Sequence, residues 1–163
     1  MPSTQQPSSR RFLVHAEEAA LETLASELPD GVESTPLADA DGLVVELPDA
    51  GDDPRSTWQS LVERLATADW VSPIVVDGDD QPHLPTGEIT VRFDRPPTDE
   101  ELKGFADAQG LELSRRNEFI AEQASFRPRD RRLTYLPDVV DRLLEEQDVS
   151  KAWLNTRSQY RRT

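Results

Sequence analysis

Short strand-like apolar runs alternate along this chain with segments that carry a single apolar helical stripe. Asp53 and Pro54 are typical of an N-cap and a first helical position, so they mark one helix start. In residues 11–76 the pattern predicts a strand at 12–14, a helix at 21–28, a weak strand at 32–36, a strand at 43–47, a helix at 54–66 and a strand at 71–76. This part of the chain therefore has the order βαββαβ.

The second half of the chain repeats that order. Thr98 and Glu101 form a capping-box pattern at a helix start, and Gly110 is a stop signal for the same helix. The predicted elements are a strand at 89–93, a helix at 99–109, strands at 111–114 and 119–126, a helix after Pro137 and a strand at 149–154. Residues 58–74 laid over 136–152, an offset of 78, give identical residues at Val62/Val140, Arg64/Arg142, Leu65/Leu143, Val71/Val149 and Ser72/Ser150. The agreement in helix phase and element order indicates an internal duplication.

Two βαββαβ units of this size predict an α+β protein made of two tandem ferredoxin-like units, each an antiparallel sheet with its helices on one face. The other sheet face is then open to a partner, to the second unit or to solvent. The expected organisation is a disordered N-terminal tail at 1–10, an acidic first unit at 11–76, an Asp/Gly/Pro-rich linker at 77–85, a second unit at 86–154 and a C-terminal tail at 155–163.

The composition excludes several classes of function. The 163 residues carry a formal charge of −14, with 17 acidic and 4 basic residues in 1–85 against 15 and 14 in 86–163. Phosphate neutralisation needs net Lys and Arg, so we expect no nucleic-acid partner. No segment approaches the roughly 20 apolar residues that span a bilayer, and the N-terminus lacks the apolar run of a signal peptide. We therefore expect no membrane partner and a cytoplasmic location.

Residues suited to catalysis or metal binding are few. The chain has no Cys and only two His, His15 and His83, so a catalytic triad or a zinc site would need distant carboxylates. The Asp-rich turns near residues 49–53 and 77–80 lack the alternating ligand pattern of a calcium loop. Trp58, Trp70 and Trp153 occupy apolar positions typical of a core. The sequence predicts no enzyme, no metal and no cofactor.

One resemblance covers most of the second unit. The segment Pro85-Thr86-Gly87-Glu88-Ile89-Thr90-Val91-Arg92-Phe93, followed by Pro97-Thr98-Asp99-Glu100-Glu101-Leu102, resembles the opening "tGeiiVkF" strand and "t.eE" helix start of subtilisin-like serine protease propeptides. Residues 136–150 are similar to their last helix and strand, and the first unit is similar in outline. The chain departs from that family in carrying two units, and in having Trp153–Arg157 where an "aEPN" exit is usual.

The resemblance implies a module that binds a subtilisin-like serine protease, in cis or in trans, as an inhibitor or folding chaperone. In that family the open sheet face packs on the protease and the C-terminal segment lies in the substrate cleft. Carried over to this sequence, the sheet-face residues are Thr90, Arg92 and Glu122. The tail residues are Asn155, Thr156, Arg157, Ser158, Gln159, Tyr160, Arg161, Arg162 and Thr163. Ordinary disorder is the alternative interpretation of this tail.

Two other functions fit the same pattern. The chain can be a non-catalytic tandem ferredoxin-like adaptor whose acidic first unit binds a basic partner. It can also be an RNA-binding module of the same topology, although it lacks aromatic residues interleaved on its strands and its charge opposes RNA. The sequence predicts neither an oligomeric state nor the identity of the protease.

Overall fold

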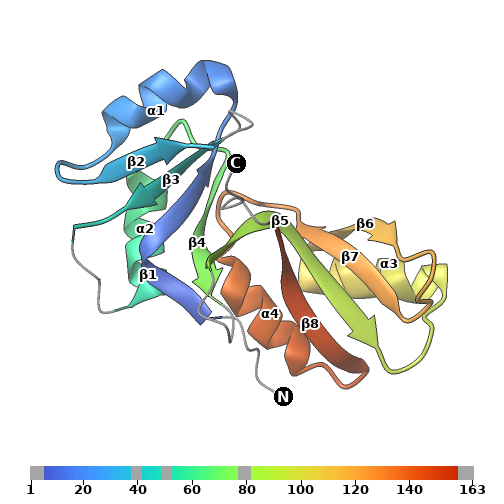
Figure 1. Cartoon of the computed structure of the whole chain (residues 1–163). Helices are drawn as coiled ribbons and strands as arrows, with labels where there is room; N and C mark the ends of the chain where they lie inside the picture. Colours follow the sequence, from blue (N-terminus) through green and yellow to red (C-terminus); the bar gives the residue numbers. More distant parts are fainter. Residues whose placement is uncertain (1–5, 38–41, 49–52, 77–81, 158–163) are drawn as a thin grey trace. The chain divides into compact units, whose positions relative to one another are not determined.

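The computed structural model describes residues 6–37, 42–48, 53–76 and 82–157, and it shows a mixed α+β protein (Figure 1). The elements of its first half are β1 (Gln6–His15), a 3-10 turn (Glu18–Ala20), α1 (Leu21–Glu27), β2 (Glu33–Pro36), β3 (Gly42–Glu46), α2 (Pro54–Arg64) and β4 (Trp70–Val76). Those of the second half are β5 (Pro82–Phe93), α3 (Asp99–Gln109), β6 (Leu111–Arg116), β7 (Gln123–Pro128), α4 (Leu136–Leu144) and β8 (Val149–Arg157). The order βαββαβ thus occurs twice.

The contacts divide the chain into two compact units. The first comprises Gln6–Pro85 with the described residues after Asn155, and the second comprises Thr86–Asn155. Strands of the first unit lie in the order β2-β3-β1-β4, with the start of β5 paired to β4 at Val75–His83. These strand pairs are antiparallel. Helix α2 packs on β1 and β4, where the Trp58 indole nitrogen donates to the Val71 carbonyl at 2.7 Å.

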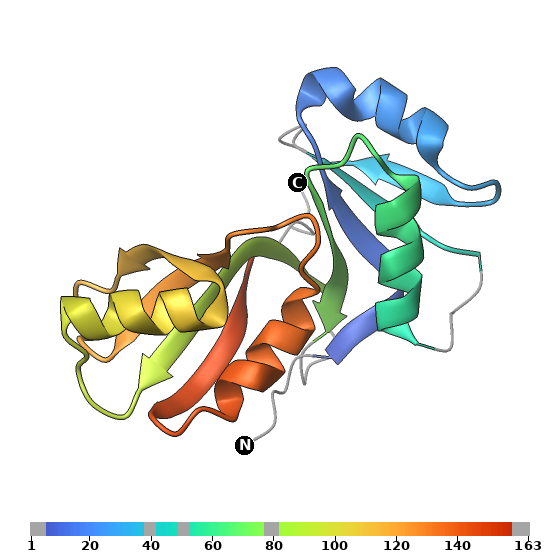
Figure 2. The same cartoon turned by 180° about the vertical axis from the view of Figure 1, so that it is seen from behind.

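Strands of the second unit lie in the order β6-β7-β5-β8. The β5–β7 and β6–β7 pairs are antiparallel. Figure 2 shows α3 and α4 on the same side of these strands. An aromatic cluster joins the two layers, because Phe105 of α3 lies 5.0 Å from Phe93 of β5 and 5.5 Å from Phe126 of β7, measured between ring centroids.

The helix boundaries follow from local chemistry that the sequence displays. The Asp53 carboxylate accepts from the Arg55 amide at the start of α2, as expected for an N-cap before Pro54. Both hydrogen bonds of the capping box between Thr98 and Glu101 are present at the start of α3. This helix ends at Gly110, whose φ of 71° lies in the left-handed region that glycine adopts without strain.

Several predicted boundaries were wrong. Strand β1 begins at Gln6, so residues 6–10 of the expected tail are strand, and β5 begins at Pro82, inside the expected linker. The strand expected at 119–126 begins only at Gln123. Ahead of it, the Asn117 side chain accepts from the amides of Phe119 and Ile120 and closes a turn, leaving Phe119 93% exposed.

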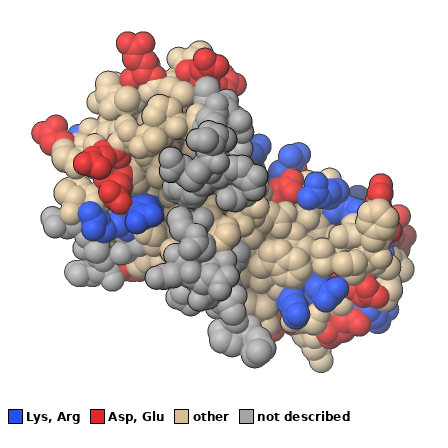
Figure 3. Space-filling view, in the orientation of Figure 1, with Lys and Arg blue, Asp and Glu red and all other residues tan. Residues whose placement is uncertain are grey.

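Charge is distributed differently over the two units. On the face drawn in Figure 3, acidic residues predominate over the first unit, whereas both signs are interspersed over the second. None of the helices in the described ranges is long and apolar enough to cross a membrane. The helices and strands described above establish the α+β class.

Candidate functional site: a hydrogen-bonded polar sheet face

The second unit presents two chemically different sheet faces because successive strand residues point to opposite sides. On β5, Ile89, Val91 and Phe93 are buried, and Phe93 belongs to the aromatic cluster beneath the helices. The alternate residues Glu88, Thr90 and Arg92 therefore lie on the face away from the helices. Polar side chains on one whole face of a central strand are the feature that distinguishes this unit.

The polar face extends to the neighbouring strands because the strand register places polar residues opposite one another. Thr90 pairs with Ser125 of β7 and Arg92 pairs with Gln123. A register shift between Leu113 and Arg115 interrupts β6, and Ser114 lies within it. Its hydroxyl reaches the Glu88 carboxylate at 2.5 Å. Three strands thus contribute hydroxyl or carboxylate groups to one face.

Strand β8 contributes the last member of the face. Three hydrogen bonds join β5, or the residue after it, to β8, or the residue before it: Asp94 to Asp148, Arg92 to Ser150 and Thr90 to Asn155. Residue numbers fall along β5 as they rise along β8, which is the order of an antiparallel pair. The Asn155 side-chain oxygen accepts from the Thr90 hydroxyl at 2.5 Å. Asn155, expected in the tail, is therefore held within the sheet.

We call Glu88, Thr90, Ser114, Ser125 and Asn155 the polar network. Thr90 has a single hydroxyl proton, which it donates to Asn155, so the 3.0 Å contact between Thr90 and Ser125 has the Ser125 hydroxyl as donor. The Asn155 amide nitrogen makes a long contact of 3.5 Å with Glu88. Ser125 thus donates to Thr90, and Thr90 donates to Asn155. The Asn155 amide nitrogen and the Ser114 hydroxyl both contact the Glu88 carboxylate.

Burial makes this network energetically important. Thr90 is 5% exposed and Ser125 is 6% exposed, so neither hydroxyl can exchange its protein partner for bulk water without a local opening. A buried polar group without a partner costs about 1–3 kcal/mol. The network therefore fixes the position of β8 against β5 at Asn155, the last residue of the second unit.

The remaining residues assigned to this site lie in several places. Arg92 shares the polar face by register and is half-buried. Glu122 does not lie in the network: its carbonyl accepts from the Phe93 amide, which places it opposite a residue of the helix-covered face. Thr156 and Arg157 continue β8, so residues 155–157 are strand and not a loose tail. Ser158, Gln159, Tyr160, Arg161, Arg162 and Thr163 lie outside the described residues.

The chemistry of the network suits binding and positioning. Its hydroxyls donate to an amide oxygen and to a carboxylate, and His15 and His83 belong to the other unit. His15 instead stacks on Trp70 at 5.2 Å and contacts the Asp69 carboxylate at 3.2 Å. Within the described part of the chain, no three His, Asp or Glu side chains are grouped to hold a metal ion.

Three members of the network, Glu88, Ser114 and Ser125, were not identified from the sequence. The alternation of Glu88, Thr90 and Arg92 in a strand was a usable signal for the first of them. No protein-family model and no curated protein matches this chain. The candidate site therefore depends on geometry and on the sequence resemblance.

Proposed function

We propose that each unit is a ferredoxin-like split βαβ module. The proposal is supported by the element order βαββαβ in each unit, and by strand orders in which the first strand of a unit lies between its third and fourth. It is further supported by the two helices of the second unit, which cover the same sheet face. The duplicated sequence register is what such a tandem arrangement would produce.

We further propose that the second unit binds a subtilisin-like serine protease as a propeptide-like inhibitor, a folding chaperone, or both. The observation that carries this proposal is the hydrogen bond between Thr90 and Asn155. It anchors the final strand at the residue where the expected protease-binding segment begins. An anchored strand end delivers the following residues in a defined direction, which lowers the entropy lost when they enter a cleft.

The rest of the polar sheet face fits the same role. An extended segment can pair with a substrate-cleft strand through main-chain hydrogen bonds, which are insensitive to the side chains it carries. Carboxylates such as Glu88 on the sheet face would gain from a position near a helix N-terminus of the protease. Residues 156–163 would fill the cleft in the manner of a bound product. Thr90 and Arg92 would lie under the sheet-face contact.

Inhibition assays with a panel of subtilisin-like proteases test this proposal. The full chain should inhibit at least one of them and leave chymotrypsin, an unrelated protease with the same catalytic groups, active. A chain ending at Asn155 should have an inhibition constant raised at least about 30-fold, because three lost main-chain hydrogen bonds at about 0.7 kcal/mol each give that factor. No inhibition across the panel by either form would refute the proposal.

The charge of the first unit favours a second candidate, a non-catalytic adaptor that binds a basic partner. Residues 1–85 contain 17 acidic and only 4 basic residues, an imbalance that the proposed protease contact does not use. Binding through this unit should weaken steeply with salt and should survive deletion of residues 156–163. The same truncated chain therefore separates the two candidates.

A further inference from the structure

A cavity of about 260 Å³ opens in the second unit where β5 ends and β8 begins. Its floor is formed by the rings of Phe93 and Phe105, which meet edge to face at 5.0 Å with an interplanar angle of 82°. The lining includes Gly104 of α3 and the charged groups of Arg95, Glu101 and Asp148. The cavity thus combines an aromatic floor with a charged rim.

Gly104 of α3 lines this cavity and is exposed, and packing within its own unit does not require a glycine there. Glycine in a helix interior is destabilising relative to alanine. A Cβ atom at Gly104 would meet no heavy atom within 4 Å, whereas one at Gly42 would lie 2.5 Å from the Val14 carbonyl oxygen. Close packing therefore explains Gly42 and leaves Gly104 unexplained. A ligand that occupies the adjacent space would explain it.

The rim carries more negative than positive charge. Arg95 and Glu101 form an ion pair at 3.2 Å. Asp148 also lines the cavity, and its carbonyl accepts from the Asp94 amide, which fixes it at the end of β5. Among the described residues Asp148 forms no salt bridge, so its charge is not paired at the rim. An occupant that complements this rim carries a positive charge.

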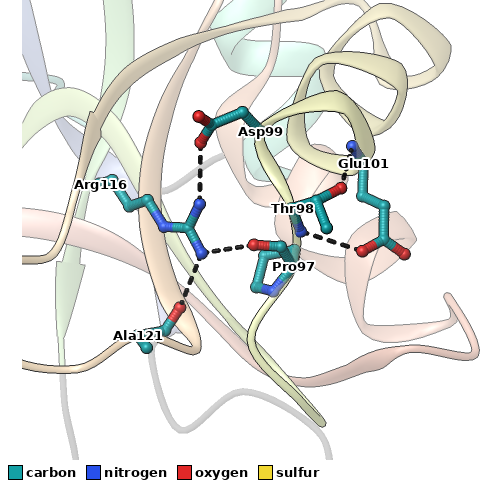
Figure 4. Close-up of polar contacts among 6 residues, drawn as sticks. All are labelled: Pro97, Thr98, Asp99, Glu101, Arg116 and Ala121. Carbon is teal, nitrogen blue, oxygen red and sulfur yellow. Dashed lines mark hydrogen bonds and ion pairs between the residues drawn. The ribbon is translucent and has the colours of Figure 1, made fainter.

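The walls of the cavity are fixed before any ligand arrives. In Figure 4, the Arg116 guanidinium contacts the Asp99 carboxylate and the carbonyls of Pro97 and Ala121, which ties the start of α3 to β6 and to the turn after it. The hydrogen bond from the Thr98 amide is the main cause that lowers the pKa of Glu101 below its ordinary value. Glu101 is therefore held in place and ionised at neutral pH.

We propose that this cavity binds a basic side chain, Arg or Lys, of a partner polypeptide. The alkyl stem would lie against Phe93 and Phe105 while the cationic group reaches Asp148 and the open edge of Glu101. A purely apolar occupant would cover the rim carboxylates without replacing their water. This site lies at the opposite end of β8 from Asn155, so it does not depend on the proposed protease contact.

An NMR titration of the full ¹⁵N-labelled chain tests the proposal with acetyl-Gly-Arg-Gly-amide. Saturable shifts should centre on the amides of Gly104, Phe105 and Asp148. The peptide with citrulline, a neutral isostere of arginine, should bind at least fivefold more weakly. Equal binding of both peptides would overturn the proposal, and so would shifts that spread over the acidic first unit without this centre.

Substitutions at the cavity separate binding from folding. Gly104→Leu should fill the space and weaken peptide binding at least tenfold, while Lys103→Arg, which keeps the charge of an exposed neighbour on α3, should leave binding unchanged. If Gly104→Leu disturbs the fold, Gly104→Ala gives the same comparison, with a higher melting temperature and weaker binding expected. Asp148→Asn should weaken binding at least fivefold. Unaltered binding in the folded Gly104 variant would refute the assignment.

Discussion

The substitution Thr90→Val tests whether the polar network holds the last strand in place. Valine keeps the shape of threonine and removes the hydroxyl that lies between Ser125 and Asn155 at 3.0 and 2.5 Å. Because Thr90 is only 5% exposed, water cannot readily replace the lost group. The buried Ser125 hydroxyl loses its acceptor, at about 1–3 kcal/mol for a buried polar group, whereas the oxygen of the half-buried Asn155 can accept from water.

The extra buried methyl group of valine offsets part of that cost, at about 0.8 kcal/mol per buried carbon. The expected net loss is therefore about 1–2 kcal/mol in the stability of the second unit. That loss corresponds to roughly a 5- to 30-fold larger population of the opened state. A loss of this size is well above the effect expected for an exposed hydroxyl.

Native-state hydrogen exchange is the appropriate assay because a chain of two compact units need not unfold in one step. Amides of β5 and β8 should lose about 1–2 kcal/mol of protection in Thr90→Val. Ser150→Ala is the matched control, since its hydroxyl donates to the Arg92 carbonyl across the same strand pair but is exposed. We expect it to change protection by no more than about 0.5 kcal/mol. Equal effects of the two substitutions would refute the reasoning.

Four further substitutions test features of the second unit by thermal denaturation. Thr98→Ala removes the N-cap of α3 and should cost about 1 kcal/mol, and Glu101→Gln should destabilise at neutral pH. The pKa of Glu101 in the folded protein is lowered from 4.5, so its carboxylate stabilises the fold above pH 4.5, and this stabilisation is lost as the pH falls through the folded pKa. The melting temperatures of Glu101→Gln and the parent should therefore become equal in acid. Burial, followed by the nearby charge of Asp138, raises the pKa of Asp141 above 3.8, so the ionised form opposes folding. Asp141→Asn should therefore stabilise at pH 7, with a gain that disappears as the pH falls to about 3.8, and a constant difference between pH 3.5 and 7 would contradict the assignment. Gly110→Ala places a side chain at φ 71° and should cost about 1 kcal/mol, and an unchanged melting temperature would argue against left-handed strain there.

Features set by neighbouring residues were predictable from the sequence. The capping box of Thr98 and Glu101, the N-cap at Asp53 and the helix stop at Gly110 all occur as expected, because each depends on contacts within a few residues. The strand alternation around Ile89 likewise gave the two faces of β5. Local chemistry therefore predicted these helix ends, whereas the strands β1, β5 and β7 begin at other residues than expected.

Long-range pairing explains what the sequence could not predict. The segment at Phe119 looked like strand because it is apolar, but the Asn117 side chain closes a turn there. Ser114 reaches Glu88 only because the register shifts within β6, and no local signal reports such a shift. Asn155 was expected in a tail, and its bond to Thr90 joins residues 65 positions apart.

Several arginines of the second unit form ion pairs that the sequence did not predict. Four of them pair with acidic residues of the same unit: Arg95–Glu101, Arg116–Asp99, Arg127–Glu112 and Arg129–Asp107. Such exposed pairs contribute little to stability, but they cancel charge locally. The second unit is thus left with little net field to attract a partner from a distance.

Salt dependence should therefore report which unit makes a given contact. Binding through the polar sheet face depends on shape and short-range hydrogen bonds, so we expect its affinity to change by less than about threefold between 50 and 500 mM salt. Binding through the first unit, with its large excess of carboxylates, should weaken by more than about tenfold over the same range. A protease inhibition constant that rises tenfold with salt would locate the dominant contact on the acidic unit and remove the polar network from the mechanism.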